Sequence, residues 1–140
     1  MEDILKFSKL LQGFKQIERT IPWVAGSAKR ENDAEHSYEL AMLAWHIIDS
    51  KKLKLDLSKV LRYALLHDMV EAYAGDTPVY PPKQKHHEDK AEREHEATIL
   101  LENNFPEFPA MHQTIKDYEE RRDEESRFVY ALDKVHPMIK

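Results

Sequence analysis

Residues 58–75 read SKVLRYALLHDMVEAYAG and combine an apolar helical pattern with two adjacent ionisable residues, His67 and Asp68. The apolar residues recur at the spacing of one helical face, which predicts a helix over about 58–74 that stops near Gly75. Two ionisable residues in a buried apolar stretch are costly unless they are paired or bound to a metal. The stretch therefore predicts a helical fold with a polar site in its interior.

Helical patterns continue outward from this stretch in both directions. Asn32 or Asp33 can cap the preceding helix, and Asp56 or Ser58 can cap this one. We interpret 17–33 as an irregular loop, and 75–84 holds three prolines and is not a regular helix. No strand pattern is convincing. The expected fold class is all-α, a compact single-domain helical bundle over residues 1–140 with about six helices: 2–17, 34–50, 58–74, 86–103, 110–121 and 124–136.

The composition is that of a soluble globular protein, with 41% hydrophobic and 34% charged residues in a chain of 140. The net charge of −5 disfavours a nucleic-acid polymer as partner, because such binders are usually basic. No stretch approaches the roughly 18 apolar residues that cross a membrane, and the N-terminus lacks a signal-peptide pattern. The absence of cysteine excludes disulfides and a thiol nucleophile. We expect no membrane partner and a cytoplasmic location.

Two further residues, His36 and Asp133, lie far from His67 and Asp68 along the chain but on other expected helices. A helical bundle can direct such side chains into one interior site. Imidazole nitrogen and carboxylate oxygen together suit ions such as Zn, Mn, Fe, Co or Ni. Taken singly, each residue fits an ordinary capping or solvent-facing role better, and only the set suggests a metal site.

The sequence around each of these residues resembles one known family. The segments are DAEHS at 33–37, LLHDMVEA at 65–72, DTP at 76–78 and FVYALDK at 128–134. Together they form the pattern H…HD…D with HDxxExxxGDxP, which resembles the HD-domain metal-dependent phosphohydrolases and, within them, the 5′-deoxynucleotidase branch. The resemblance extends over about residues 4–137.

The resemblance implies a role for each matching residue. It implies a divalent metal ion (Co²⁺, Mn²⁺, Mg²⁺, Zn²⁺ or Ni²⁺) held by His36, His67, Asp68 and Asp133, which would activate water for attack. Glu71, three residues after Asp68 and on the same face of the expected helix, would act as general acid or base. The resemblance also implies four substrate-binding residues: Arg19 at the phosphate, Trp23 near the sugar or base, Asp76 at a sugar hydroxyl, and Thr77. Of these, Arg19 and Asp76 would also contribute to catalysis.

The function expected from this resemblance is that of a 5′-nucleotidase, which removes phosphate from (deoxy)nucleoside 5′-monophosphates. Three alternatives stay open: a guanosine tetraphosphate pyrophosphohydrolase, a non-catalytic metal- or nucleotide-binding module, and an iron-dependent oxygenase. The short chain and the HDxxExxxGD pattern favour the nucleotidase over the tetraphosphate hydrolase.

The other histidines and the apolar surface suggest simpler roles. His86, His87 and His95 lie in a charged run and are interpreted as part of a solvated helix face. His46, His112 and His136 are interpreted as surface residues or as residues behind the site, and His136, three after Asp133, could approach it. Apolar positions left exposed on several helices suggest a homodimer.

Overall fold

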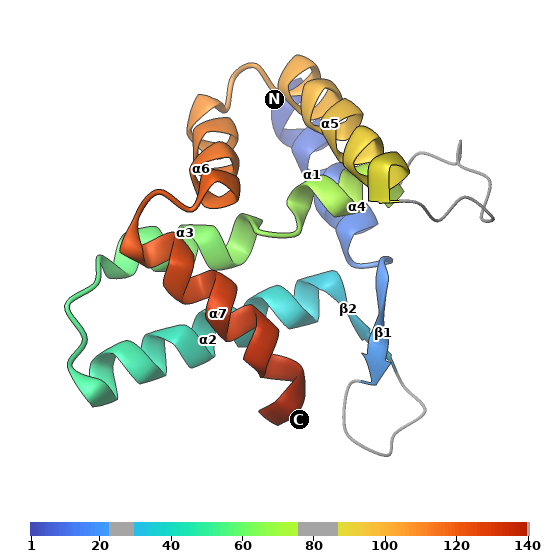
Figure 1. The fold of residues 1–140 in the computed structure, drawn as a ribbon. Helices are drawn as coiled ribbons and strands as arrows, with labels where there is room; N and C mark the ends of the chain where they lie inside the picture. The colour runs from blue at the N-terminus through green and yellow to red at the C-terminus, as the bar shows by residue number, and fades with distance from the viewer. Residues whose placement is uncertain (23–29, 76–86, 140) are drawn as a thin grey trace.

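The computed structural model describes residues 1–22, 30–75 and 87–139 (Figure 1). Over these residues it contains seven helices and a sheet of two strands. The all-α class is confirmed, with one more helix than the expected six. The elements are α1 (Glu2–Phe14), β1 (Glu18–Pro22), β2 (Arg30–Asn32), α2 (Asp33–Lys51), α3 (Leu57–Leu66), α4 (Met69–Gly75), α5 (His87–Asn104), α6 (Pro109–Glu120) and α7 (Glu124–Ile139).

Short polar side chains set where the helices that carry the site begin. Asn32 caps α2: its side chain accepts a hydrogen bond from the amide of Glu35 (2.8 Å), and the Glu35 carboxylate accepts one from the amide of Asn32 (2.9 Å). Asp56 caps α3 in the same way, by accepting from the amide of Lys59. Both caps are among those that the sequence predicts.

The prediction of one helix over 58–74 is wrong, because the chain leaves the helix at His67 and Asp68 and starts α4 at Met69. The ring of His67 bonds to the carbonyl oxygen of Ala64 (2.8 Å), the acceptor that a continuing helix would offer to the amide of residue 68. The break supplies the additional helix and turns Asp68 toward His67 and Arg19.

The interpretation of 17–33 as an irregular loop is wrong at both of its ends. Glu18–Pro22 and Arg30–Asn32 pair as antiparallel strands, with Glu18 opposite Asn32 and Pro22 opposite Arg30 and an irregularity between them. These strands are too short to show a clear alternation of apolar and polar residues, which is why the sequence did not reveal them. Their pairing leads the chain directly into the first turn of α2.

Two apolar clusters form the core. One joins α1, α4, α5 and α6 around residues such as Phe14 and Leu101, and the other joins α2, α3 and α7 around Leu40, Val60 and Val129. Each fully buried aliphatic side chain contributes roughly 1.5–3 kcal/mol. The second cluster holds α7 across α2 and α3 (Figure 1) and so brings three site-bearing segments together. Within the described ranges, no helix is long and apolar enough to cross a membrane.

Candidate metal centre

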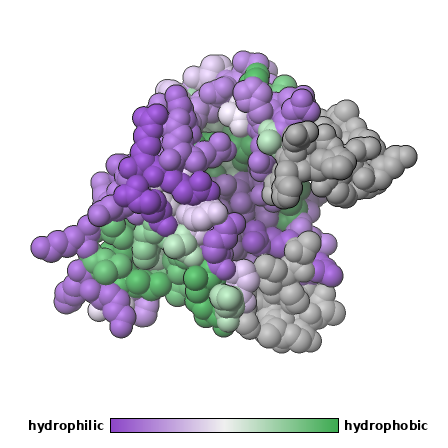
Figure 2. All heavy atoms as spheres, in the orientation of Figure 1, coloured by the Kyte–Doolittle hydropathy of each residue, from purple (hydrophilic) through white to green (hydrophobic). Residues whose placement is uncertain are grey.

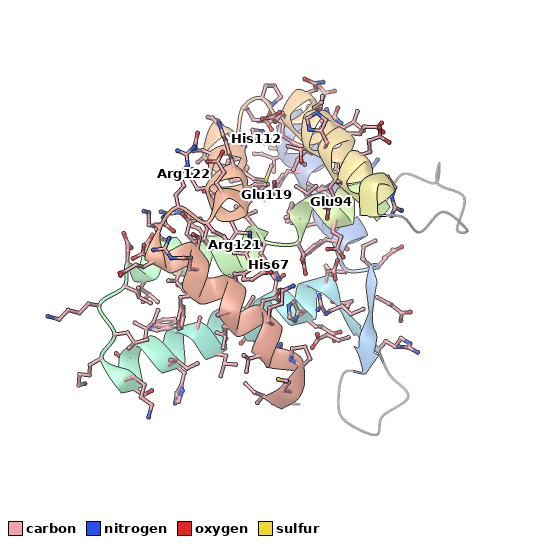
Figure 3. The ribbon with its side chains drawn as sticks, in the orientation of Figure 1. His67, Glu94, His112, Glu119, Arg121 and Arg122 are labelled. Carbon is pink, nitrogen blue, oxygen red and sulfur yellow. The ribbon has the colours of Figure 1, made fainter. Side chains whose placement is uncertain are left out.

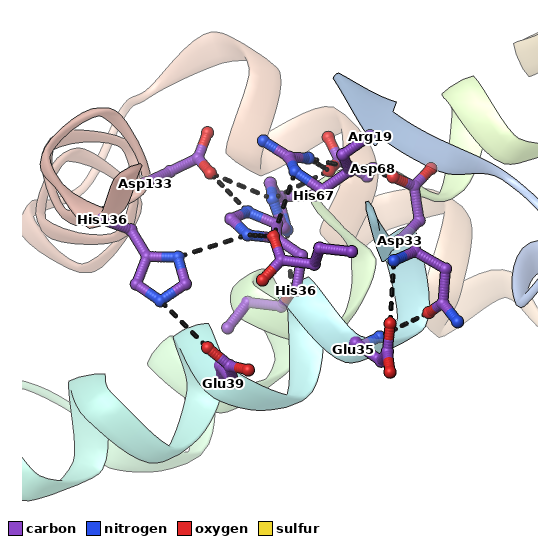
Figure 4. A network of polar contacts seen from close by, with 12 residues as sticks. Arg19, Asp33, Glu35, His36, Glu39, His67, Asp68, Asp133 and His136 are labelled. Carbon is purple, nitrogen blue, oxygen red and sulfur yellow. Dashed lines mark hydrogen bonds and ion pairs between the residues drawn. The ribbon is translucent and has the colours of Figure 1, made fainter. Parts of the chain in front are cut away.

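Three segments bring the four expected metal ligands to one place (Figure 4). His36 lies in the first turn of α2, His67 and Asp68 form the turn between α3 and α4, and Asp133 lies on α7. Both histidine Nε2 atoms face Oδ1 of Asp133, at 2.7 Å from His36 and 3.4 Å from His67. Asp68 Oδ2 lies 3.2 Å from His67 Nε2. Ligand atoms of His36, His67 and Asp133 lie within 4.8 Å of one another.

The donor set fits a divalent cation, and the ring of His67 provides the test. A carbonyl oxygen only accepts hydrogen bonds, so Nδ1 of His67 donates to Ala64 and Nε2 is left to act as a ligand. This Nε2 is buried and has no hydrogen-bond partner among the described residues, although the oxygens of Asp68 and Asp133 are near. A buried, unsatisfied ring nitrogen facing two carboxylates is the arrangement that a bound cation would satisfy.

The electrostatics of the cluster agree with that fit. Burial disfavours a charged ring at His67, but the carboxylates of Asp133 and Asp68 outweigh it and raise its pKa to about 10. Burial also disfavours the charged form of Asp133 and so acts to raise its pKa. Hydrogen bonds to the rings of His36 and His67 outweigh this effect and hold the pKa of Asp133 well below its usual range. The carboxylates are therefore placed to stabilise positive charge at this point, whether of a proton or of a metal ion.

Arg19 on β1 lies beside the cluster, with its guanidinium directed toward three acids. Its Nη1 is 3.1 Å from Asp68 Oδ2 and 3.8 Å from Asp33 Oδ1, and its Nε is 3.3 Å from Glu31 Oε2. Burial, and then the charges of Asp68 and Glu71, raise the pKa of Asp33 to about 7. In this structure Arg19 orients Asp68, and its expected contact with phosphate stays a prediction.

Glu31 and His136 both contact the ring of His36. The sequence did not indicate Glu31, and it left open whether His136 lies at the surface or near the site. Glu31 Oε2 and His136 Nδ1 lie 3.2 and 3.3 Å from His36 Nδ1, and all three side chains are buried. His136 is thus no surface residue. Its spacing of three from Asp133 was a usable signal, since residues so spaced share a helix face. Glu31 lay in a segment interpreted as a loop and gave no signal.

A cleft of about 570 Å³ opens beside the cluster, between α4, α5, α6 and α7. Glu71 lies in the first turn of α4 and lines this cleft together with Asp68. The expectation that these two share one helix face is wrong, because Asp68 precedes the helix. Trp23, Asp76 and Thr77 lie outside the described residues. The cleft is lined by His67, Asp68, Glu71, Ala91, Glu94, His95, Thr98, Tyr118, Glu119, Arg121, Tyr130, Asp133 and Lys134.

Comparisons with known proteins identify the class to which this fold and site belong. Residues 11–140 match the sequence profile of the HD domain family. The chain therefore belongs to the HD domain family, and the resemblance drawn from the sequence is confirmed.

Named relatives and a solved structure support the same assignment. The 5′-deoxynucleotidase HDDC2 of Xenopus laevis is 30% identical over 99% of this chain and 67% of that protein. The 5′-deoxynucleotidase YBR242W of Saccharomyces cerevisiae is 32% identical over 97% of this chain and 58% of that protein. A crystal structure of a predicted metal-dependent phosphohydrolase from Magnetospirillum magnetotacticum MS-1 superposes with a TM-score of 0.77, at 31% identity over 99% of this chain and 68% of that one. The chain spans about two thirds of the length of most of the relatives it matches.

Proposed function

We propose that this chain is a metal-dependent 5′-deoxynucleotidase, a phosphomonoester hydrolase that converts deoxynucleoside 5′-monophosphates to nucleoside and phosphate. The observation that carries the proposal is the unsatisfied Nε2 of His67, which faces Asp68 and Asp133 at the wall of a cleft. The names of the relatives supply the reaction class. A cleft of about 570 Å³ is in the range that accommodates a small-molecule ligand.

We assign separate roles in hydrolysis to the residues of the cluster. His36, His67, Asp68 and Asp133 would hold a divalent metal ion, which supplies a water of lowered pKa and polarises the phosphate. Glu71 takes a proton from the attacking water and passes it to the departing 5′ oxygen, so that the P–O bond breaks without releasing an alkoxide. Glu31 and His136 orient the ring of His36, and the Ala64 carbonyl orients that of His67.

Recognition of the sugar and base is assigned to residues beyond the described part of the chain. On the strength of the family resemblance, we assign Asp76 to a sugar hydroxyl, Trp23 to the sugar or base, and Thr77 to substrate binding. Arg19 is retained as a contact to phosphate that also holds Asp68. The metal is one of Co²⁺, Mn²⁺, Mg²⁺, Zn²⁺ or Ni²⁺, all compatible with nitrogen and oxygen ligands.

Phosphate release tests the proposal. The protein is treated with a chelator, and each metal is added back before assay with a panel of deoxy- and ribonucleoside 5′-monophosphates. We expect metal-dependent release from the deoxynucleotides and none from Asp68→Ala. A protein that binds a metal but releases no phosphate from any nucleotide would rule the proposal out.

We also retain a homodimer and a cytoplasmic location as part of the proposal. Figure 2 shows hydrophobic residues gathered over α2 and the C-terminal part of α7. The large apolar side chains exposed on these helices include Met42, Trp45, Val135 and Met138. An apolar surface of this kind is commonly buried by a second copy, and sedimentation of the wild type against Trp45→Glu measures it. The lack of cysteine fits a reducing compartment, which cell fractionation tests.

A further inference from the structure

The cleft beside the metal ligands is lined by more acidic than basic side chains, although the proposed substrate is an anion. Its described carboxylates are Asp68, Glu71, Glu94, Glu119 and Asp133. Among the described lining residues, histidines apart, the cations are Arg121 and Lys134. A phosphate monoester carries between one and two negative charges near neutral pH. Such a ligand needs positive groups besides the metal, and these two are the described side chains placed to supply them.

Arg19, proposed above as a contact to the phosphate, does not by itself supply this charge, because its guanidinium also faces carboxylates and does not line the cleft. It is within ion-pair distance of Glu31, Asp33 and Asp68. Arg121 and Lys134, in contrast, form no ion pair with any carboxylate in the part of the chain that the structure describes. Their charge is thus available to a ligand in the cleft.

Arg121 is held in position by the backbone around it. It follows α6 in the left-handed conformation (φ 49°, ψ 45°), with its amide bonded to the carbonyls of Asp117 and Tyr118. Its own carbonyl accepts a bond from Nη1 of Arg127 (3.0 Å). The guanidinium carbon lies 3.7 Å from the ring centroid of Tyr130. Its Nη1 donates to the carbonyl oxygen of Glu119 (3.5 Å), and stacking on the ring leaves the other in-plane N–H groups able to donate to a ligand.

Tyr130 joins both cations to the helix that carries a metal ligand. Lys134 lies one turn after Tyr130 on α7 and next to Asp133, and its Nζ is 5.0 Å from the Tyr130 ring centroid. His67, Glu94 and Glu119, which Figure 3 labels together with Arg121, line the same cleft. The two positive groups therefore lie on the α6–α7 wall, beside the metal ligands.

We propose that Arg121 and Lys134, supported by the ring of Tyr130, form an anion subsite that binds the phosphate of the substrate and the inorganic phosphate product. The inference rests on the proposed function and adds to it the place where the phosphate binds, which is the α6–α7 wall of the cleft. Arg121 supplies a planar pair of donors and Lys134 a point charge, a combination suited to a tetrahedral oxyanion.

Inorganic phosphate is the probe that tests the subsite without turnover. It is titrated into the Mg²⁺-loaded full chain by calorimetry, with wild type, Arg121→Gln, Lys134→Gln and the control Arg122→Gln. Arg122 neighbours Arg121 but pairs with Glu120 outside the cleft. We expect each cleft substitution to raise the phosphate Kd about tenfold, as for loss of one charged hydrogen bond, and the control to leave it unchanged.

Substitution of Tyr130 tests whether its ring holds Arg121 and Lys134 in position, without removing either positive charge. Tyr130→Phe keeps the ring and should keep the phosphate Kd, whereas Tyr130→Ala should raise it. The inference is overturned if the wild type binds no phosphate, or if Arg121→Gln and Lys134→Gln both bind it as the wild type does.

Nucleotide kinetics distinguish failure of the subsite from failure of the enzyme. A wild type that hydrolyses deoxynucleotides, with KM unchanged in both cleft variants, refutes the subsite alone. A wild type that binds phosphate through these cations but hydrolyses no nucleotide refutes the proposed function and leaves the subsite standing.

Discussion

Nδ1 of His67 lies 2.8 Å from the carbonyl oxygen of Ala64, one helical turn earlier. This bond fixes the tautomer of the ring, directs Nε2 toward Asp68 and Asp133, and accompanies the end of α3. One local contact thus prepares a metal ligand and also breaks the helix that the apolar pattern predicts.

Removal of one ligand should abolish metal binding and turnover together. We expect His67→Ala and Asp68→Ala to purify with little metal and to release no phosphate, because each loses a donor from a small set. Metal content by mass spectrometry, measured beside activity, checks this. His46→Ala is the control, since His46 is exposed on α2 away from the cluster. Full metal content in both ligand variants would contradict the assignment.

Substitution of Glu71 should separate metal binding from chemistry. Glu71→Gln keeps the shape of the side chain but cannot take a proton, so we expect normal metal content and a fall in kcat of about 10²–10⁴-fold. The measurement is steady-state phosphate release at saturating metal. Glu102→Gln, an exposed acid on α5, serves as control. Wild-type activity in Glu71→Gln would remove the residue from the mechanism.

The buried contact between Glu31 and His36 should tune metal affinity. Glu31 Oε2 lies 3.2 Å from Nδ1 of His36, so its charge makes the ring a stronger donor. We expect Glu31→Gln to weaken metal binding about 10–100-fold. Competition with a fluorescent chelator measures this Kd, and an unchanged value would show that Glu31 acts only on Arg19.

Asp123 should make the free energy of unfolding depend on pH. Burial opposes its charged form, but hydrogen bonds from Tyr63 (2.6 Å), Ser126 (2.8 Å) and Lys59 (3.0 Å) outweigh it and lower the pKa. A lowered pKa in the folded state contributes stability above the unfolded value of 3.8, and this stability is lost as pH falls through the folded pKa.

Replacement of this carboxylate tests the sign of that dependence. Asp123→Asn should lower the free energy of unfolding by about 1 kcal/mol at pH 7, because the hydrogen bonds from Lys59 and Tyr63 lose their charged acceptor, and by less at pH 3. Thermal unfolding across this pH range provides the measurement. A loss of stability that grows toward acid pH would contradict the prediction.

Local sequence determined the features that depend on hydrogen bonds between near neighbours. Asn32 and Asp56 cap their helices through amides three residues later, so their effect is visible in the sequence. Helix periodicity likewise located α2, α5, α6 and α7 to within a few residues. The pattern of His36, His67, Asp68 and Asp133, together with the sequence around each of them, was sufficient to recognise the family.

Only the tertiary structure decided the contacts between distant residues. His136 meets His36 across 100 positions because α7 packs over α2, and Glu31 reaches the same ring because β1 and β2 pair. Arg121 lies on Tyr130 because α6 ends in a left-handed residue. The spacing of His136 from Asp133 indicated a shared helix face but not the contact with His36. All of these contacts depend on how apolar surfaces pack and not on the propensity of the segment itself.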